Sequence, residues 1–294
     1  MAANAAAAGT VTIGDLSIHR LGFGTMRLTG PGMFGPPPDL AAARAALRSV
    51  RELGINFIDT ANAYGPMIAE LLVRECCHPY DGLVVSTKGG LLRPGPEQWM
   101  QDGRPSSLRT AVEASIKVLG VERLDLWFLH RVDEKVPTDD QFGVVAEMQR
   151  AGLIRHVGLS DVSVEQLEKA GTYFPVTCVQ FGYHVVQRKH EGMLEYCERI
   201  GIPFIAYFPL GTGMLAAPDS VLARVAAKIG ITPAQAAIAW LLKRSPSLVT
   251  IPGTSRPDHL RENVAAAEVA LSSEQYAEIE RVGEKASRMR ASAT

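Results

Sequence analysis

Four titratable side chains in this sequence have the types needed to move a proton at a carbonyl group. Asp59, Lys88 and His130 each end a predominantly apolar run, and Tyr64 follows Asp59 within a short polar stretch. A carboxylate, an ammonium, an imidazole and a phenol can together protonate a carbonyl oxygen. Any one of them could be a solvated loop residue, so the elements that carry them must decide whether they meet.

The pattern suggests a role for each of these groups. Tyrosine is a weak acid at neutral pH, and a nearby ammonium lowers its pKa by stabilising the phenolate. We expect Lys88 to supply that charge, Asp59 to hold Lys88 charged and oriented, and His130 to orient the carbonyl or share the proton with Tyr64. None of these side chains can donate a hydride, so the chemistry implies a cofactor, most simply a reduced nicotinamide.

Helices and strands alternate along most of the chain. Apolar runs typical of strands covered on both faces alternate with helical patterns eight times, counting residues 21–26 as the first strand. A Ser/Thr-x-x-Gln capping pattern predicts four of the helix starts, at Thr138, Ser163, Thr232 and Ser272. We therefore predict an α/β fold, a (β/α)8 TIM barrel with an N-terminal β-hairpin over residues 11–19 and extra helices.

The active site of such a barrel lies at the C-terminal ends of its strands. The polar strand ends predicted to meet there are Asp59, Lys88, His130, Ser160, Gln180 and Tyr207, with Tyr64 just beyond Asp59. This convergence favours a functional site over six unrelated loop residues.

Composition narrows the other possibilities. The formal net charge of -1 argues against a nucleic-acid partner, and no apolar run is long enough for a membrane span. Residues 1–10 lack the features of a signal peptide and are predicted to be a disordered leader before a single domain over residues 11–294. The four cysteines lack the spacing of a metal site, so we predict no metal and a cytoplasmic protein with reduced thiols.

The sequence lacks the motifs of several other enzyme classes. Arg27 occupies the position where a G-x-G-x-x-G dinucleotide fingerprint would need its third glycine, and no Tyr-x-x-x-Lys or His-x-His pair occurs. Ser160 and Ser255 lack the second glycine of a nucleophile elbow.

With these residues in place, the chain resembles the aldo-keto reductase family from about Val11 to Val282. The resemblance rests on the Asp-Thr-Ala-x-x-Tyr-Gly stretch at residues 59–65, Ser-Thr-Lys-Gly at 86–89 and Leu-His-Arg at 129–131. It implies a catalytic tetrad of Asp59, Tyr64, Lys88 and His130, with Tyr64 as the general acid and Asp59 also touching the nicotinamide ribose. The implied activity is reduction of an aldehyde or ketone.

The resemblance also implies a cofactor, NADPH, with NADH as a second candidate. Asp161 stands where asparagine is usual, Phe208 replaces a serine, and Gly253 replaces a frequent lysine. Arg256 beside two hydroxyls favours a 2′-phosphate, although a solvated arginine explains it equally well. The implied cofactor-binding residues are Gly24, Thr25, Met26, Asp59, Ser160, Asp161, Gln180, Tyr207, Phe208, Leu210, Gly211, Gly213, Gly253, Thr254, Ser255, Arg256, His259, Glu262 and Asn263.

Substrate and regulation stay open at this level. Met33, Phe34 and Trp99 are predicted to line the substrate side of the mouth. The chain resembles a microbial subgroup that includes pyridoxal reductases, so pyridoxal and ketones of secondary metabolites are both candidates. The alternative is a nucleotide-binding regulatory subunit with the same barrel and little turnover. The sequence does not predict the oligomeric state.

Overall fold

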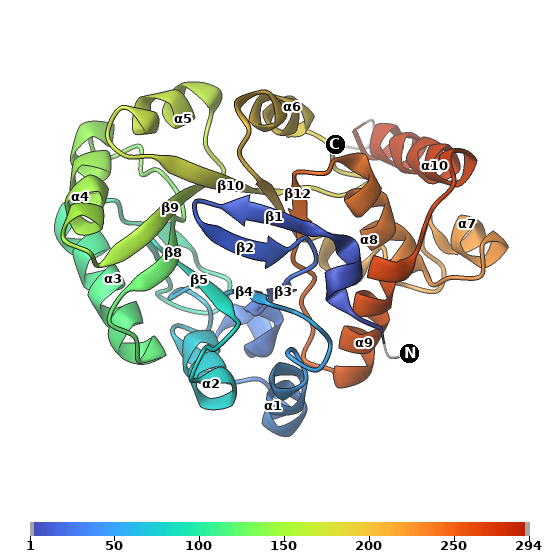
Figure 1. The fold of residues 1–294 in the computed structure, drawn as a ribbon, viewed down its shortest axis with the longest axis horizontal. Helices are drawn as coiled ribbons and strands as arrows, with labels where there is room; N and C mark the ends of the chain where they lie inside the picture. The colour runs from blue at the N-terminus through green and yellow to red at the C-terminus, as the bar shows by residue number, and fades with distance from the viewer. Residues whose placement is uncertain (1–2, 292–294) are drawn as a thin grey trace.

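Eight parallel strands form a barrel inside a ring of helices in the computed structural model, which describes residues 3–291 (Figure 1). The strands neighbour one another in chain order. A bridge between Leu21 and Thr250 joins the two edges of the sheet, and the predicted (β/α)8 barrel is confirmed. The strands are β3 (Phe23–Gly24), β4 (Phe57–Asp59), β5 (Val84–Gly89), β8 (Leu124–Leu129), β9 (Ile154–Ser160), β10 (Val176–Gly182), β11 (Phe204–Tyr207) and β12 (Leu248–Thr250).

The helices pack apolar faces against the outer side of this sheet. The core between the strands and the helices includes the fully buried Trp127 of β8. Burying a side chain of this size stabilises the fold by about 3 kcal/mol. The helices are α1 (Leu40–Arg48), α2 (Ile68–Cys77), α3 (Pro105–Leu119), α4 (Thr138–Arg150), α5 (Val164–Gly171), α6 (Glu191–Ile200), α7 (Ala223–Lys228), α8 (Pro233–Arg244), α9 (Pro257–Ala265) and α10 (Ser273–Ala291).

Three of the four predicted capping boxes form, at Ser163, Thr232 and Ser272. The box predicted at Thr138 is wrong. Pro137 is the N-cap of α4, so Thr138 already lies inside the helix. The Gln141 side chain turns away to pair with the backbone of Asp133, accepting from its N–H and donating to its carbonyl, each at 2.9 Å.

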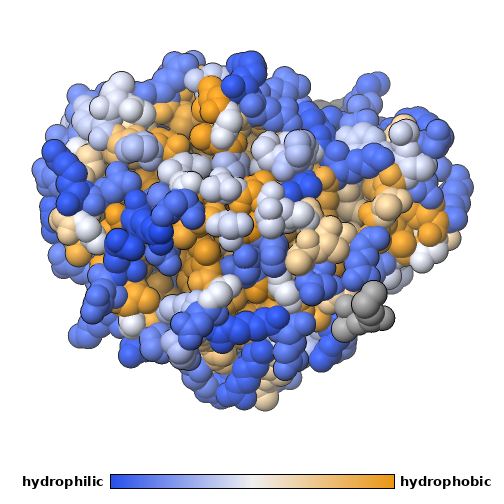
Figure 2. All heavy atoms as spheres, in the orientation of Figure 1, coloured by the Kyte–Doolittle hydropathy of each residue, from blue (hydrophilic) through white to orange (hydrophobic). Residues whose placement is uncertain are grey.

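The end of the barrel opposite the predicted site is covered by the hairpin of β1 (Thr10–Ile13) and β2 (Leu16–His19), as Figure 1 shows. Ile13 and Ile18 are fully buried and pack with Phe57 and Leu126 inside the barrel. Figure 2 shows this face, where hydrophilic side chains surround smaller apolar areas. No helix within residues 3–291 is long and apolar enough to cross a membrane.

The N-terminal segment corrects one prediction. Residues 1–2 lie outside the described range, but residues 3–10 are not a disordered leader. Ala5–Ala8 forms a 3-10 helix capped by the Asn4 side chain. Ala5 is fully buried and its N–H donates to the Leu53 carbonyl at 2.8 Å. Small alanine side chains allow this close packing, which a composition argument misses.

The loops at the C-terminal ends of the strands differ most from the prediction. The first strand is only two residues long. It ends at Gly24, where a β-carbon would lie 2.6 Å from the Ile251 carbonyl oxygen, so only glycine allows this close approach. The predicted loop after β5 contains a hairpin of β6 (Leu91–Leu92) and β7 (Met100–Gln101). The non-glycine residues with positive φ, a strained conformation, lie outside the α-helices and strands, and two of them, Met33 and Thr212, lie in short 3-10 helices. The others are Met67, Glu97, Asp161 and Phe208.

Candidate active site

A buried ion pair lies at the centre of the site. Lys88 is fully buried on β5, and its Nζ lies 2.6 Å from Asp59 Oδ2 and donates to the Thr60 carbonyl at 2.8 Å. Asp59 Oδ1 accepts from the Ser86 hydroxyl at 2.9 Å and from Gln180 Nε2 at 2.8 Å. Side chains of two strands, β5 and β10, thus hold the carboxylate, and both of its oxygens are paired.

Tyr64 and His130 complete the cluster. The Tyr64 hydroxyl lies 3.4 Å from Lys88 Nζ, and the Tyr64 and His130 rings meet edge to face with centroids 6.1 Å apart. Only 7% of Tyr64 is exposed, yet both rings line the large cavity described below. The Nδ1 atom of His130 is buried and has no hydrogen-bond partner among the described residues. The structure therefore brings Asp59, Tyr64, Lys88 and His130 together.

Burial controls the protonation of this cluster. It lowers the pKa of Lys88, an effect that Asp59 opposes, and it lowers the pKa of His130 well below the usual range, helped by the charges of Lys88 and Arg131. His130 is therefore neutral at pH 7, where a lowered pKa leaves imidazole without its second proton.

The expected effect of Lys88 on Tyr64 is wrong for this structure. Burial raises the pKa of Tyr64 above its usual value, and the nearby Asp59 charge raises it further. Desolvation of the phenolate is the largest of these effects and outweighs the nearby positive charge of Arg131, which lowers the pKa. Tyr64 consequently keeps its proton, which is the state a proton donor needs.

A cavity of about 1300 Å³ opens beside these groups and continues to the start of α9. Predicted residues on its wall are Gly24, Thr25, Met26, Met33, Asp59, Tyr64, Trp99, His130, Ser160, Gln180, Tyr207, Phe208, Leu210, Gly213, Gly253, Thr254, Ser255, Arg256, His259, Glu262 and Asn263. Four predicted residues do not line it: Lys88 lies behind Asp59 and Tyr64, and Phe34, Asp161 and Gly211 are also outside the lining. Its length and its glycine-rich, hydroxyl-bearing far end fit an extended dinucleotide better than a small substrate alone.

Asp161 has an unexpected partner. Its Oδ2 lies 2.5 Å from Arg131 Nη2 and accepts the Tyr207 hydroxyl at 2.7 Å. Arg131 also donates to the Ser160 hydroxyl at 3.0 Å and lines the cavity. The carboxylate predicted to face the cofactor is thus turned toward Arg131. Arg131 is not among the predicted site residues, although it follows His130 in the Leu-His-Arg stretch.

The far end of the cavity explains the glycine at position 253. A β-carbon there would lie 2.4 Å from the Gly24 carbonyl oxygen, so β3 and the loop after β12 approach too closely for a side chain. Arg256 is exposed and pairs with Asp258 at 3.0 Å. Arg27, which we did not predict as a site residue, donates to the Thr212 carbonyl at 2.9 Å and so joins two loops of the cavity wall.

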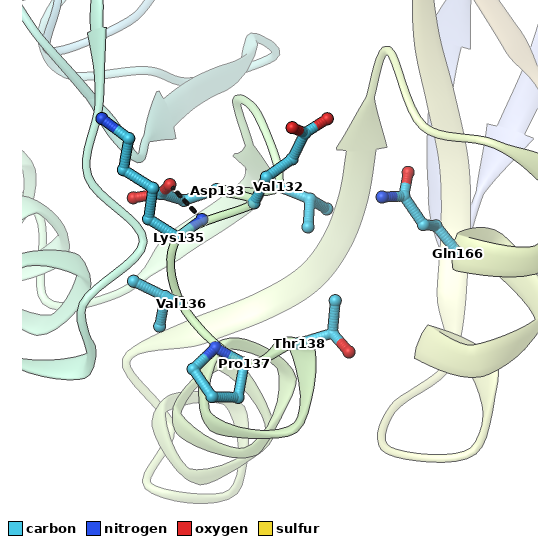
Figure 3. A pocket seen from close by; sticks show the side chains of 8 residues that line it. Val132, Asp133, Lys135, Val136, Pro137, Thr138 and Gln166 are labelled. Atoms are coloured by element: carbon cyan, nitrogen blue, oxygen red, sulfur yellow. Dashed lines mark hydrogen bonds between the residues drawn. The ribbon is translucent and has the colours of Figure 1, made fainter.

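A smaller hollow of about 480 Å³ lies between the segment after β8 and α5 (Figure 3). The Asp133 carboxylate at its edge already accepts from the backbone N–H groups of Gly103 and Lys135, each at 3.0 Å. This group stabilises the loop. Within residues 3–291 no three His, Cys, Asp or Glu side chains are grouped so as to hold a metal ion.

Comparison with other proteins gives matches over nearly the whole chain. Residues 20–284 match the model of the aldo/keto reductase family. An uncharacterized oxidoreductase of Schizosaccharomyces pombe is 50% identical, over 96% of this chain and 92% of its own. Pyridoxine 4-dehydrogenase of Escherichia coli is 40% identical, over 90% of this chain and 95% of its own.

Solved structures agree with the fold. A glycerol dehydrogenase of Gluconobacter oxydans superposes with a TM-score of 0.83 at 24% identity, covering 94% of this chain and 95% of its own. An aldo-keto reductase of Klebsiella pneumoniae in complex with NADPH has a TM-score of 0.76 at 26% identity, covering 96% and 95%. Since the family model and both relatives span most of its length, the chain belongs to the aldo/keto reductase family of oxidoreductases.

Proposed function

We propose that the protein reduces an aldehyde or ketone to the alcohol with NADPH, and that Tyr64 is the general acid. One observation carries the proposal: Tyr64 lines the cavity, and its hydroxyl lies 3.4 Å from the Lys88 ammonium. Burial raises the pKa of Tyr64, so the phenol keeps its proton. A bound reduced nicotinamide supplies the hydride. The phenol supplies the proton to the carbonyl oxygen, and Lys88 stabilises the phenolate that forms.

The other two groups set the geometry of that transfer. Asp59 keeps Lys88 charged and fixes its direction, because both carboxylate oxygens are held by side chains of β5 and β10. His130 is neutral, so it can donate a hydrogen bond to the carbonyl oxygen without competing with Tyr64 as a strong acid. The buried Nδ1 atom of His130 has no hydrogen-bond partner among the described residues.

The cofactor would occupy the long cavity. Ser160 and Gln180 lie beside Asp59 at the nicotinamide end, where Gln180 Nε2 is already committed to Asp59 and its oxygen is left for an amide donor. Thr254, Ser255 and Arg256 would bind a 2′-phosphate near the N-terminus of α9, which favours an anion. The NADPH complex of the Klebsiella pneumoniae neighbour supports this cofactor.

For the substrate, we propose an apolar or aromatic carbonyl, with pyridoxal and ketones of secondary metabolites as candidates. Met33 and Trp99 line the cavity near His130, and the name of the Escherichia coli relative points to a pyridoxine or pyridoxal substrate. The four cysteines are unpaired, which fits a protein of the reducing cytoplasm.

The experiment is a panel of aldehydes and ketones, with pyridoxal included, assayed with NADPH and with NADH. We expect one molecule of alcohol for each NADPH oxidised, and a lower kcat/KM with NADH. Arg256→Ala should raise KM for NADPH and leave KM for NADH unchanged. No turnover across the panel, together with tight NADPH binding and a co-purifying partner, would contradict the proposal and favour a regulatory subunit.

A further inference from the structure

Arg93, on the β6–β7 hairpin, joins three loops at the cavity mouth and has no role in the proposed reaction. It is 7% exposed. Its guanidinium donates to the Gln98 carbonyl within its own hairpin at 2.8 Å and, in the loop after β3, to the carbonyls of Gly32 at 2.6 Å and Met33 at 3.1 Å. A further bond of 3.4 Å reaches the Ala63 carbonyl, next to Tyr64.

The same guanidinium covers one face of Trp99. Its central carbon lies 3.7 Å from the centre of the indole, a distance typical of arginine stacking on an aromatic ring. The edge of Trp99 meets the His130 ring with centroids 6.4 Å apart. Trp99 also lines the cavity, and 39% of it remains exposed. One arginine therefore contacts both these loops and an aromatic side chain that lies beside His130.

All four acceptors of Arg93 are backbone carbonyls, which hold its position but do not neutralise its charge. The planar fork of arginine can bond several carbonyls while its face stays against the indole, a geometry that lysine lacks. Trp99 lies between β6 and β7, and because 39% of it is exposed, fewer contacts restrain its rotamer than in a buried tryptophan.

We propose that Arg93 is a positioning residue that holds Trp99 as a fixed wall of the substrate pocket, and that this wall selects planar aromatic carbonyl compounds over aliphatic ones. The inference rests on the proposed carbonyl reduction. A fixed indole gives a flat substrate a stacking surface without the cost of ordering it, beside the imidazole that orients the carbonyl.

The positioning can be tested without turnover. Trp127 and Trp240 are fully buried, so acrylamide quenching of tryptophan fluorescence reports chiefly on Trp99. Arg93→Met should increase the quenching constant, and Arg93→Lys should give an intermediate value. Met100→Ala, on the same hairpin but outside the cavity lining, is the matched control and should leave quenching unchanged. Thermal unfolding confirms that each variant is folded.

The selectivity is measured as the ratio of kcat/KM for 4-nitrobenzaldehyde to kcat/KM for propanal. Trp99→Ala should lower this ratio by roughly three- to tenfold, the range expected for one lost aromatic contact. Arg93→Met should lower it in the same direction, with most of the change in KM, and Met100→Ala should not alter it.

The outcomes separate the two levels of the proposal. Unchanged quenching in Arg93→Met overturns the positioning role. If quenching changes in Arg93→Met but the ratio of the two kcat/KM values is unchanged in both Arg93→Met and Trp99→Ala, the proposed selectivity is overturned. Absence of turnover by the wild-type protein on every carbonyl overturns the proposed function and the selectivity with it, while quenching still decides the role of Arg93.

Discussion

Two clusters in this molecule combine a tyrosine, a carboxylate and cationic side chains, but their hydrogen bonds connect these groups differently. At the barrel mouth, Asp59 is paired with Lys88, and the Tyr64 hydroxyl lies 3.4 Å from the lysine. Where α6 meets α8, Tyr183 donates directly to Glu191 at 2.6 Å, and Arg244 donates to the same carboxylate at 2.7 Å.

The difference lies in what each tyrosine hydroxyl can still do. The Tyr183 hydroxyl donates its proton in a hydrogen bond to Glu191, which Arg188 also binds at 2.8 Å. These partners occupy the hydroxyl, so the cluster holds helices together and has no donor left for a substrate. Tyr64 donates to no carboxylate within residues 3–291, and it lines a cavity. The same residue types thus build a structural clamp in one place and a candidate proton donor in the other.

Removing the two hydroxyls is the strongest test of this comparison. Tyr64→Phe should lower kcat by roughly 10²- to 10⁴-fold, the usual contribution of general acid catalysis. Tyr183→Phe should leave kcat unchanged and lower the free energy of unfolding by about 1 kcal/mol, the value of one hydrogen bond. Steady-state kinetics and urea unfolding measure the two effects. Similar kcat values for Tyr64→Phe and Tyr183→Phe would contradict the assignment of a catalytic role to Tyr64 and a structural role to Tyr183.

Removing a cation should also affect the clusters unequally. Lys88→Met leaves the Asp59 charge buried without its partner, so we expect a loss of about 3–5 kcal/mol in the free energy of unfolding. Arg244→Met should cost less, because Arg188 still pairs with Glu191. The double variant Lys88→Met/Asp59→Asn should regain stability but not turnover. Recovery of turnover would show that Lys88 acts only through folding.

Acid pH should weaken the helix clamp. Bonds from Arg188, Tyr183 and Arg244 outweigh burial and lower the pKa of Glu191 from 4.5 to about 2. A depressed folded-state pKa stabilises the fold above pH 4.5, and this stability is lost as the pH falls through about 2. Because Glu191 is partly exposed, solvent screening keeps this contribution below about 3 kcal/mol at neutral pH.

Glu191→Gln makes that effect measurable. We expect the variant to be less stable than the wild-type protein at pH 7 and the difference to shrink toward pH 2.5, as followed by urea unfolding. A difference that is constant with pH would mean that Glu191 contributes by packing and not by its charge.

Asp161 and Tyr207 give the smallest expected effect. As in the Tyr183–Glu191 cluster, the tyrosine donates to a carboxylate that is also paired with an arginine, but this pair lies at the barrel mouth. Tyr207 donates to Asp161 at 2.7 Å, and Arg131 pairs with the same oxygen. Asp161→Asn keeps an acceptor for both donors, so we expect at most about 1 kcal/mol in NADPH binding, measured by fluorescence titration. A loss of 100-fold would show that the charge itself acts on the cofactor.

Some parts of the site could be predicted because they follow from local pattern and topology. Asp59, Lys88 and His130 end apolar strands, and parallel strands of a barrel carry their C-terminal ends to one face. The predicted contact between Lys88 and Asp59 is present at 2.6 Å. These inferences need only the period of the strands and the rule for where barrel sites lie.

Other parts depend on which side chains meet across loops. The ion pair of Arg131 with Asp161 and the stack of Arg93 on Trp99 join residues whose spacing in sequence carries no periodic signal. The hairpin of β6 and β7 has only two residues in each strand, too few for an alternating pattern. The 3-10 helix at Ala5–Ala8 lies in a stretch that composition alone predicts to be a disordered leader.

The sequence by itself determined the alternation of strands and helices, the barrel, and the set of groups that gather at its mouth. The tertiary structure decided the protonation of those groups and their partners. Tyr64 shows why: its neighbour Lys88 was predictable, but its raised pKa reflects burial and the charge of Asp59 in three dimensions. Desolvation depends on everything packed around a group, and no local pattern records it.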